Sequence, residues 1–356
     1  MSVTAGFKQR CVRTGKTIWR TLRVRLGLAI GCSSPVASFA DPVFDNPQNR
    51  YDPGPPRDLS PIGVKSRFVV LGSGLPLPLP HRRGPASAVL VNDRAYFFDA
   101  GAGIWAGIAN AASVHGGEVS KALDRQRLSP LFLTHLHPDH TVGIPEFLFL
   151  SWFLGRATPI DIYGPPGTER RVDKIIEAWQ DTIDAELTSG PFHAPENGWK
   201  ANGIDVAVGN RGVVFKDENV TVEAFWHKHT NLDYNYAYRV TTPDRVIVIG
   251  GDGGDDDNLI EAAKDADIFV MELQTEKDLA NTPWGGESLE EKRDYIGSFH
   301  IFPDQLARVA KAANVKTLVL YHLGNYSRPF DGEALLKEMR KVYDGKIYQS
   351  RDGDVF

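Results

Sequence analysis

Four potential metal ligands lie within six residues of this chain, directly after a short hydrophobic segment. The segment Leu131-Phe-Leu-Thr134 has the composition of a buried strand, and His135, His137, Asp139 and His140 follow it. On an extended backbone, residues two apart point to the same side, so the first two histidines can converge on one ion. The proline after them favours a turn, which lets the last two face a neighbouring point. Three imidazoles and a carboxylate suit Zn²⁺ or a similar ion, so we expect a metal site here.

Further ligand-type residues follow other predicted strands. Hydrophobic segments at 220–226, 246–249 and 317–320 precede His229, Asp252 and His322, respectively. Sites in open α/β folds gather where strands end. The resulting seven candidates are enough for two metal ions with about three protein ligands each and one shared group. His227 lies two residues before His229 and is an alternative ligand on that strand.

The order of strands and helices predicts a layered fold. Strand hairpins come first, strand–helix alternation follows, and the same order recurs in the second half of the chain. This order favours an α/β sandwich of several layers over a single parallel sheet. Residues 188–218 are rich in Gly, Pro and Asn and are predicted to be a loop. Residues 144–154 are apolar on nearly all sides and predict a buried helix, with a contact in a homo-oligomer as the alternative.

The first forty residues differ from the rest of the chain. They carry seven Lys and Arg but no Asp or Glu, and a short apolar run leads to Ser38-Phe-Ala40. These features predict a signal peptide over 1–40, cleavage after Ala40, and a periplasmic or secreted protein. A disordered basic arm, a transit peptide and an amphipathic helix are alternatives, and lipoprotein processing at Cys32 is less favoured. Residues 41–65 are predicted to be an irregular lead-in.

The composition of the remaining chain excludes several classes of protein. Both cysteines, Cys11 and Cys32, belong to the leader, which excludes a disulfide scaffold or a thiolate metal site in the body. The whole chain has a formal charge of −5, so without the seven leader cations the body is at −12. This acidic balance disfavours nucleic acid as a partner. No apolar run reaches the roughly 18 residues that a transmembrane helix needs.

The ligand cluster is one of several short motifs between residues 70 and 322. They are the His-x-His-x-Asp-His motif at 135–140, Val70-Leu-Gly-Ser-Gly-Leu-Pro76, Arg83-Gly-Pro-Ala-Ser87, Phe98-Asp-Ala-Gly101, Gly164-Pro-Pro-Gly-Thr168, Tyr236-Ala-Tyr-Arg239, Gly251-Asp252 and Leu318-Val-Leu-Tyr-His322. In this combination the chain resembles the metallo-β-lactamase superfamily, and within it the ribonuclease Z and arylsulfatase-type branch. The resemblance implies an α/β fold, a four-layer αβ/βα sandwich, in one hydrolase domain over 66–356.

The resemblance also implies roles for the candidate ligands. One Zn²⁺ would be held by His135, His137 and His229, the other by Asp139, His140 and His322, and Asp252 would bridge both. Mn²⁺ or Fe²⁺ are alternatives. The offset of the Tyr-Ala-Tyr-Arg segment favours His229 over His227. A hydroxide between the metals would be the nucleophile. The bridging motif is often Gly-Asp-Thr, but Gly253 replaces the threonine here, so a local hydrogen bond is lost.

Three residues are predicted to act in catalysis. Asp139 would also orient the nucleophile. His300 matches a histidine of this branch that contacts the reacting group, where it would stabilise developing charge or assist the leaving group. Its alternative is a histidine satisfied at a helix start. Glu272 would orient the residues of the site without binding a metal itself, or it would be a buried structural carboxylate.

These features predict an exported dinuclear zinc hydrolase of a small anionic sulfate or phosphate ester. Lactone or thioester hydrolysis, a ribonuclease Z-like nuclease and a non-catalytic metal-binding relative are the alternatives. A tRNA-processing member needs a long arm after the third histidine, but only 22 residues separate His229 from Asp252. Together with the acidic body and the export signal, this spacing disfavours tRNA as a substrate.

Overall fold

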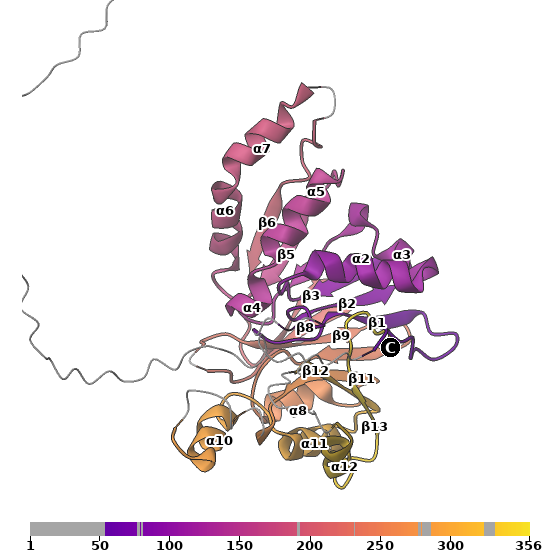
Figure 1. Cartoon of the computed structure of the whole chain (residues 1–356), viewed down its shortest axis with the longest axis vertical. Helices are drawn as coiled ribbons and strands as arrows, with labels where there is room; N and C mark the ends of the chain where they lie inside the picture. The colour runs from indigo at the N-terminus through magenta and orange to yellow at the C-terminus, as the bar shows by residue number, and fades with distance from the viewer. Residues whose placement is uncertain are drawn as a thin grey trace, which may run out of the picture. The chain divides into compact units, whose positions relative to one another are not determined.

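Two β-sheets form the centre of the molecule (Figure 1). The first has the strand order β1-β2-β3-β4-β5-β6, so its spatial order follows the sequence. Its strands are β1 (Ser66–Gly72), β2 (Ala86–Val91), β3 (Arg94–Phe98), β4 (Leu131–Phe132), β5 (Ile160–Gly164) and β6 (Ala201–Asp205). The second sheet has the order β13-β12-β11-β10-β9-β8-β7. Its strands are β7 (Arg211–Lys216), β8 (Thr221–Trp226), β9 (Tyr236–Thr241), β10 (Val246–Ile249), β11 (Ile268–Leu273), β12 (Thr317–Leu323) and β13 (Lys346–Gln349).

The two sheets repeat one pairing pattern. In the first sheet, β1, β2 and β3 pair antiparallel, and β3 to β6 pair parallel. In the second, β7 to β10 pair antiparallel, and β10 to β13 pair parallel. Antiparallel neighbours need only a tight turn, whereas parallel neighbours need a crossover. The predicted recurrence of hairpins followed by strand–helix units is therefore confirmed.

Helices cover the outer face of each sheet. Those of the first half are α2 (Ile104–His115), α3 (Gly117–Ala122), the short turn η2 (Arg125–Arg127), α4 (Pro138–Thr141), the π-helical turn η3 (Glu146–Leu150), α5 (Ser151–Phe153), α6 (Thr168–Ala178) and α7 (Gln180–Leu187). Those of the second half are α8 (Asp257–Ala263), α10 (Leu289–Gly297), α11 (Pro303–Ala312) and α12 (Gly332–Met339). Helix α2 packs on β1, and α11 packs on β11.

Three hydrophobic cores separate the layers. Side chains such as Phe98, Phe132 and Tyr238 fill the space between the two sheets. Ile104 and Ile108 of α2 belong to a core on the outer face of the first sheet. Leu306 of α11 belongs to a core on the outer face of the second. Alternate residues of each strand enter different cores because strand side chains alternate between faces. The predicted four-layer αβ/βα sandwich is confirmed.

Two segments differ from their predicted structure. Residues 188–218 are not one loop, because β6 and β7 lie within them at the edges of the two sheets. Both strands are half-exposed, so their hydrophobic pattern is weak. In the apolar segment 144–154, Phe147 and Trp152 are buried, but Phe153 keeps 60% of its surface exposed. This segment is therefore not a buried helix throughout.

The computed structural model describes residues 54–356 except 77–78, 80, 191–192, 231, 277–278, 280–285 and 324–331. The predicted signal peptide over 1–40, with its cleavage site and Cys32, lies outside the described residues, as do residues 41–53 of the predicted lead-in. Export therefore stays a prediction. Within the described part of the chain, no helix has the length and apolarity of a membrane span.

Candidate active site

The predicted ligands come together where strands of both sheets end. The segment after β4 carries His135 and His137 and then Asp139 and His140 in α4, and the loops after β8 and β10 carry His229 and Asp252. His322 lies near the end of β12. Hydrophobic packing fixes the position of each strand, so the polar residues that follow the strands lie at one edge of the sandwich. The structure thus brings all seven candidates into one site.

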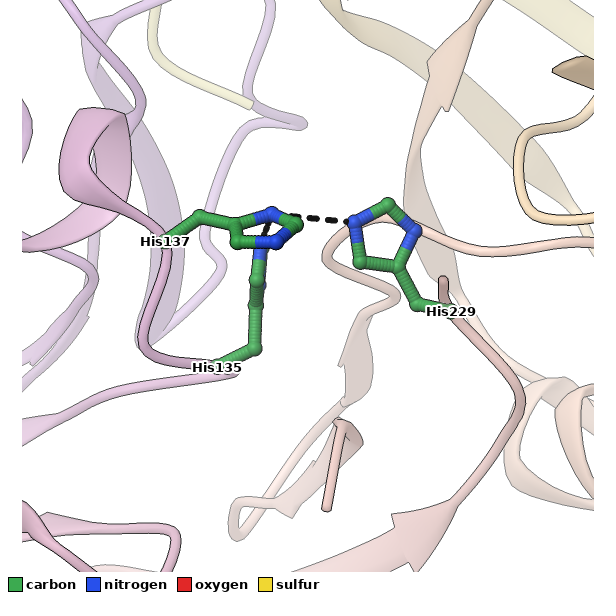
Figure 2. Close-up of side chains that lie close together, drawn as sticks. All are labelled: His135, His137 and His229. Carbon is green, nitrogen blue, oxygen red and sulfur yellow. Dashed lines mark hydrogen bonds between the residues drawn. The ribbon is translucent and has the colours of Figure 1, made fainter. Parts of the chain in front are cut away.

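Three of these histidines face one another, with His135 and His137 on one segment and His229 on another (Figure 2). Nδ1 of His137 lies 3.0 Å from Nε2 of His135 and 3.2 Å from Nε2 of His229. His135 and His229 are buried, and His137 is half-buried. The three nitrogens therefore point to a common position that is reached from both halves of the chain.

A second group lies beside the first. Nε2 of His322 is 3.1 Å from Oδ2 of Asp139, and Nε2 of His140 is 3.5 Å from the same oxygen. Asp252 reaches this group with both oxygens, since Oδ1 lies 3.3 Å from His140 and Oδ2 lies 3.4 Å from His322. Asp252 also groups with His135 of the first cluster. One carboxylate therefore connects the two clusters.

The spacing of these atoms fits metal ions. Donor atoms about 2.0–2.1 Å from a tetrahedral Zn²⁺ are about 3.3–3.4 Å from one another, close to the distances between these side chains. Among the described residues, the buried atoms Nε2 of His140 and Oδ1 of Asp252 make no hydrogen bond. Buried polar atoms without such a partner need another source of stabilisation. Two metal ions held by these seven residues would supply it.

The outer nitrogens of three ligand histidines are held in place. Nδ1 of His140 lies 2.8 Å from the buried Asp99, Nδ1 of His229 lies 2.7 Å from the carbonyl oxygen of Phe299, and Nδ1 of His135 lies 3.0 Å from the Thr134 hydroxyl. Such contacts select the tautomer that presents the other nitrogen to a metal. Asp99 was not predicted as a site residue. Its signal in the sequence was a single Asp directly after the hydrophobic strand 95–98.

Burial and charge divide the histidines into two kinds. Burial lowers the pKa of His135 and His137, and it lowers the pKa of His229 to about 3, so these rings stay neutral. Burial also disfavours the charged form of His140, but the carboxylates of Asp252 and Asp99 outweigh it and raise its pKa. The neutral first cluster already has the protonation state that metal binding requires. The raised pKa of His140 shows that the surroundings of the second cluster favour a positive charge.

His300 and Glu272 form a pair beside the first cluster. Nδ1 of His300 lies 2.6 Å from both oxygens of Glu272, and Glu272 is fully buried on β11. Burial opposes charge on His300, but Glu272 raises its pKa above the usual value. Burial in turn raises the pKa of Glu272. The pair therefore holds a proton near the ligand His229, whose ring centroid is 5.0 Å from that of His300.

An open cavity of about 760 Å³ adjoins the second cluster. Its lining residues include Asp139, Val142, His81, Arg82 and Arg83. Nη1 of Arg83 lies 3.2 Å from Asp352, which is largely buried. Cationic side chains so close to the ligand cluster favour an anionic substrate.

The family of the chain follows from comparison with known proteins. A model of the β-lactamase superfamily domain matches residues 94–323, which include all seven candidate ligands. The chain therefore belongs to this superfamily and is a metal-dependent hydrolase of the metallo-β-lactamase fold.

Individual relatives agree with this assignment. Ribonuclease Z of Mycobacterium bovis (strain BCG / Pasteur 1173P2) is 28% identical over 264 residues, which are 72% of this chain and 85% of the relative. The metallo-β-lactamase fold protein YhfI of Bacillus subtilis superposes with a TM-score of 0.59 at 19% identity, covering 82% of this chain and 98% of its own. Human tRNase Z, short form, gives a TM-score of 0.57 at 21% identity with the same coverage.

These names conflict with one prediction from the sequence. Acidic composition disfavoured nucleic acid as a partner, yet the curated relatives are named ribonuclease Z. Net charge reports the whole surface, whereas a small site needs only local cations, so the overall balance does not decide between these partners. The strands β9 and β10 occupy most of the short segment between His229 and Asp252, as the spacing in the sequence predicted.

Proposed function

We propose that this protein is a two-metal phosphodiesterase. The observation that carries the proposal is the pair of ligand clusters that share Asp252. One ion would be held by His135, His137 and His229, and the other by Asp139, His140 and His322. Zinc suits this set of nitrogen and carboxylate donors, with Mn²⁺ or Fe²⁺ as alternatives. Bound ions of this kind lower the pKa of water and neutralise the attacking and leaving oxygens of an anionic ester.

The side chains around the clusters would supply the remaining chemistry. Asp139 faces His322 with Oδ2 and is also a residue of the cavity wall, so its carboxylate can accept a hydrogen bond from an attacking water. His300 keeps 16% of its side chain exposed, so it can reach a bound substrate. Glu272 holds Nδ1 of His300, and the proton that the pair retains can pass to a leaving oxygen.

Phosphodiesters fit the named relatives better than aryl sulfates do, and the cavity suits either anion. The curated relatives are named for an action on RNA, a phosphodiester polymer. The cavity beside Asp139 is also lined by the partly exposed Arg83, a residue type that suits the oxygens of a phosphate. Sulfate ester hydrolysis, which the sequence predicted beside phosphate ester hydrolysis, shares the anionic character of the substrate and is therefore included in the test.

The test is a panel of esters that share one leaving group. The purified chain, loaded with zinc, is assayed with bis-p-nitrophenyl phosphate, p-nitrophenyl phosphate, p-nitrophenyl sulfate and p-nitrophenyl acetate, and with a labelled single-stranded RNA. We expect the diester to be cleaved with the largest kcat/KM of the nitrophenyl series, and the activity to disappear with a chelator. Preferential cleavage of the sulfate or the acetate would overturn the proposed substrate class. RNA cleavage would show that the diester site accepts a polymer.

A further inference from the structure

His227 lies beside the site but belongs to no ligand cluster. It is fully buried just after β8, and the ligand groups formed by the described residues do not include it. Its Nε2 lies 2.9 Å from the carbonyl oxygen of Gly250, where it donates a hydrogen bond. This carbonyl stands two residues before Asp252, the carboxylate that connects the two clusters. The ring therefore holds the start of the bend that carries the shared ligand.

The same ring fills the space beside Gly253. A Cβ atom built on Gly253 would lie 2.3 Å from Cε1 and 2.4 Å from Nδ1 of His227, which is closer than real Cβ contacts allow. Gly253 also has a φ of +156°, which disfavours residues with side chains. The ring of His227 thus occupies the space that a side chain at position 253 would need. Together they explain why the usual threonine after the bridging aspartate does not occur here.

Two other side chains hold the bend from different directions. Nδ2 of Asn235 donates to the carbonyl oxygen of Asp252 at 2.8 Å, and the amide of Gly253 donates to Glu272 at 2.8 Å. Each contact restrains a different residue of the bend. His227 restrains its first residue and excludes movement toward the space beside Gly253. The position of Asp252 is therefore set by backbone contacts before any ion binds.

We propose that His227 is a positioning residue for Asp252, acting through its hydrogen bond to Gly250 and its packing against Gly253. The inference rests on the proposed function, because it concerns the carboxylate that would be shared by two metal ions. The carbonyl oxygen of Gly250 can only accept a hydrogen bond, so Nε2 of His227 carries the hydrogen in this contact. Replacing a residue that orients a metal ligand without binding the metal itself typically changes the metal affinity about 10- to 100-fold.

The experiment separates the hydrogen bond from the packing. His227→Phe keeps a ring but removes the donor, so we expect zinc to transfer to a chelator about 10- to 100-fold faster than from the wild-type protein. His115→Phe is the matched control, because Nε2 of His115 lies 2.7 Å from the carbonyl oxygen of Gly353, also a glycine, outside the ligand clusters. We expect the control to release zinc at the wild-type rate. The Co²⁺-loaded proteins should show an altered ligand-field spectrum only for His227→Phe.

A double-mutant cycle tests the packing. Gly253→Ala is measured in the wild-type chain and in His227→Ala, with zinc transfer to a chelator as one readout and thermal unfolding of the metal-free protein as the other. We expect Gly253→Ala to accelerate zinc loss at least about fivefold less in the His227→Ala background, because residues in contact do not act additively. Unfolding of the metal-free protein reveals any variant that fails to fold.

The outcomes distinguish the inference from the proposed function. A wild-type protein that binds no metal would overturn both. If the wild type binds metal but His227→Phe releases it at the wild-type rate, the positioning role is wrong and the proposed function stands. Equal effects of Gly253→Ala in the two backgrounds would also overturn the packing between His227 and Gly253.

Discussion

Asp99 accepts a hydrogen bond from His140, with 2.8 Å between Oδ2 and Nδ1. The other oxygen of Asp99 accepts the backbone N–H of Thr134 at 2.8 Å. Asp99 has a φ of 58°, in the left-handed region, which turns the chain directly after β3. One buried carboxylate thus joins the end of β3 to the start of the ligand loop after β4.

Asp99→Asn tests this connection. An asparagine presents one NH₂ group, which must face a donor on either His140 or Thr134, so one contact is lost whichever way the amide turns. We expect zinc affinity at the second cluster to fall about 10- to 100-fold while the protein still folds. Metal content after dialysis against graded chelator concentrations measures the effect. Asp124→Asn, at an exposed turn where Asp124 accepts the amide of Gln126, is the control and should retain all its zinc.

The ligand role of His137 can be tested against another histidine. His137→Ala removes the nitrogen that faces both His135 and His229, so we expect the first cluster to lose its metal and phosphodiesterase activity to fall at least about 10³-fold. Zinc stoichiometry should drop from two equivalents to one or fewer. His193→Ala replaces an exposed histidine whose Nδ1 lies 3.0 Å from the backbone oxygen of Gly190, and it should leave both values unchanged. Full activity of His137→Ala would contradict the assignment.

Removal of metal should also lower the stability of the protein. Without ions, the carboxylates of Asp139 and Asp252 lie 3.1–3.5 Å from the rings of His140 and His322 and share these two rings as countercharge. Binding to the folded state adds about 2.7 kcal/mol per site when the free metal is at 100 times its dissociation constant. We expect a lower melting temperature in chelator and recovery on addition of zinc, followed by circular dichroism. A melting temperature independent of metal would count against a built metal site.

The pH dependence of the reaction should report on Glu272. Burial alone would lower the pKa of His300, but Glu272 raises it above the ordinary value. If protonated His300 assists the leaving group, activity is present below this pKa and lost as pH rises through it. Glu272→Gln removes the negative charge, so the alkaline fall in kcat should move to lower pH. Identical alkaline limbs in the two proteins would show that His300 is not the titrating group.

Arg83 should affect substrate binding rather than chemistry. Its guanidinium lines the cavity and contacts Asp352 at 3.2 Å, outside both ligand clusters. We expect Arg83→Gln to raise KM for an anionic diester about 10-fold and to leave kcat within about twofold, because it removes an interaction made equally in ground and transition states. Arg211→Gln, a surface variant whose partner is Glu261, is the control. A loss confined to kcat would move Arg83 into the chemical step.

The ligand set was largely predictable because its signals are local. His135, His137, Asp139 and His140 follow one hydrophobic strand within six residues, and strand-end position pointed to His229, Asp252 and His322. The repeated order of hairpins and strand–helix units predicted the layers for the same reason. Edge strands β6 and β7 were missed since half-exposed strands lack a strong hydrophobic pattern.

Local sequence patterns did not predict the contacts between distant segments of the chain. The sequence favoured His229 over His227 as the ligand, but it did not predict the contact of His227 with the carbonyl oxygen of Gly250. The importance of Asp99 depended on a hydrogen bond to a residue 41 positions away. The pairing of Glu272 with His300 likewise joins β11 to the segment before α11.

The sequence by itself determined which residue types stand at the ends of the strands, because hydrophobic periodicity and ligand spacing are properties of neighbouring residues. Only the tertiary structure decided which of them face one another. Ligand geometry, the neutral or charged state of each histidine and the support from Asp99, His227 and Glu272 arise where two sheets pack together, and packing is a relation between residues that the chain keeps far apart.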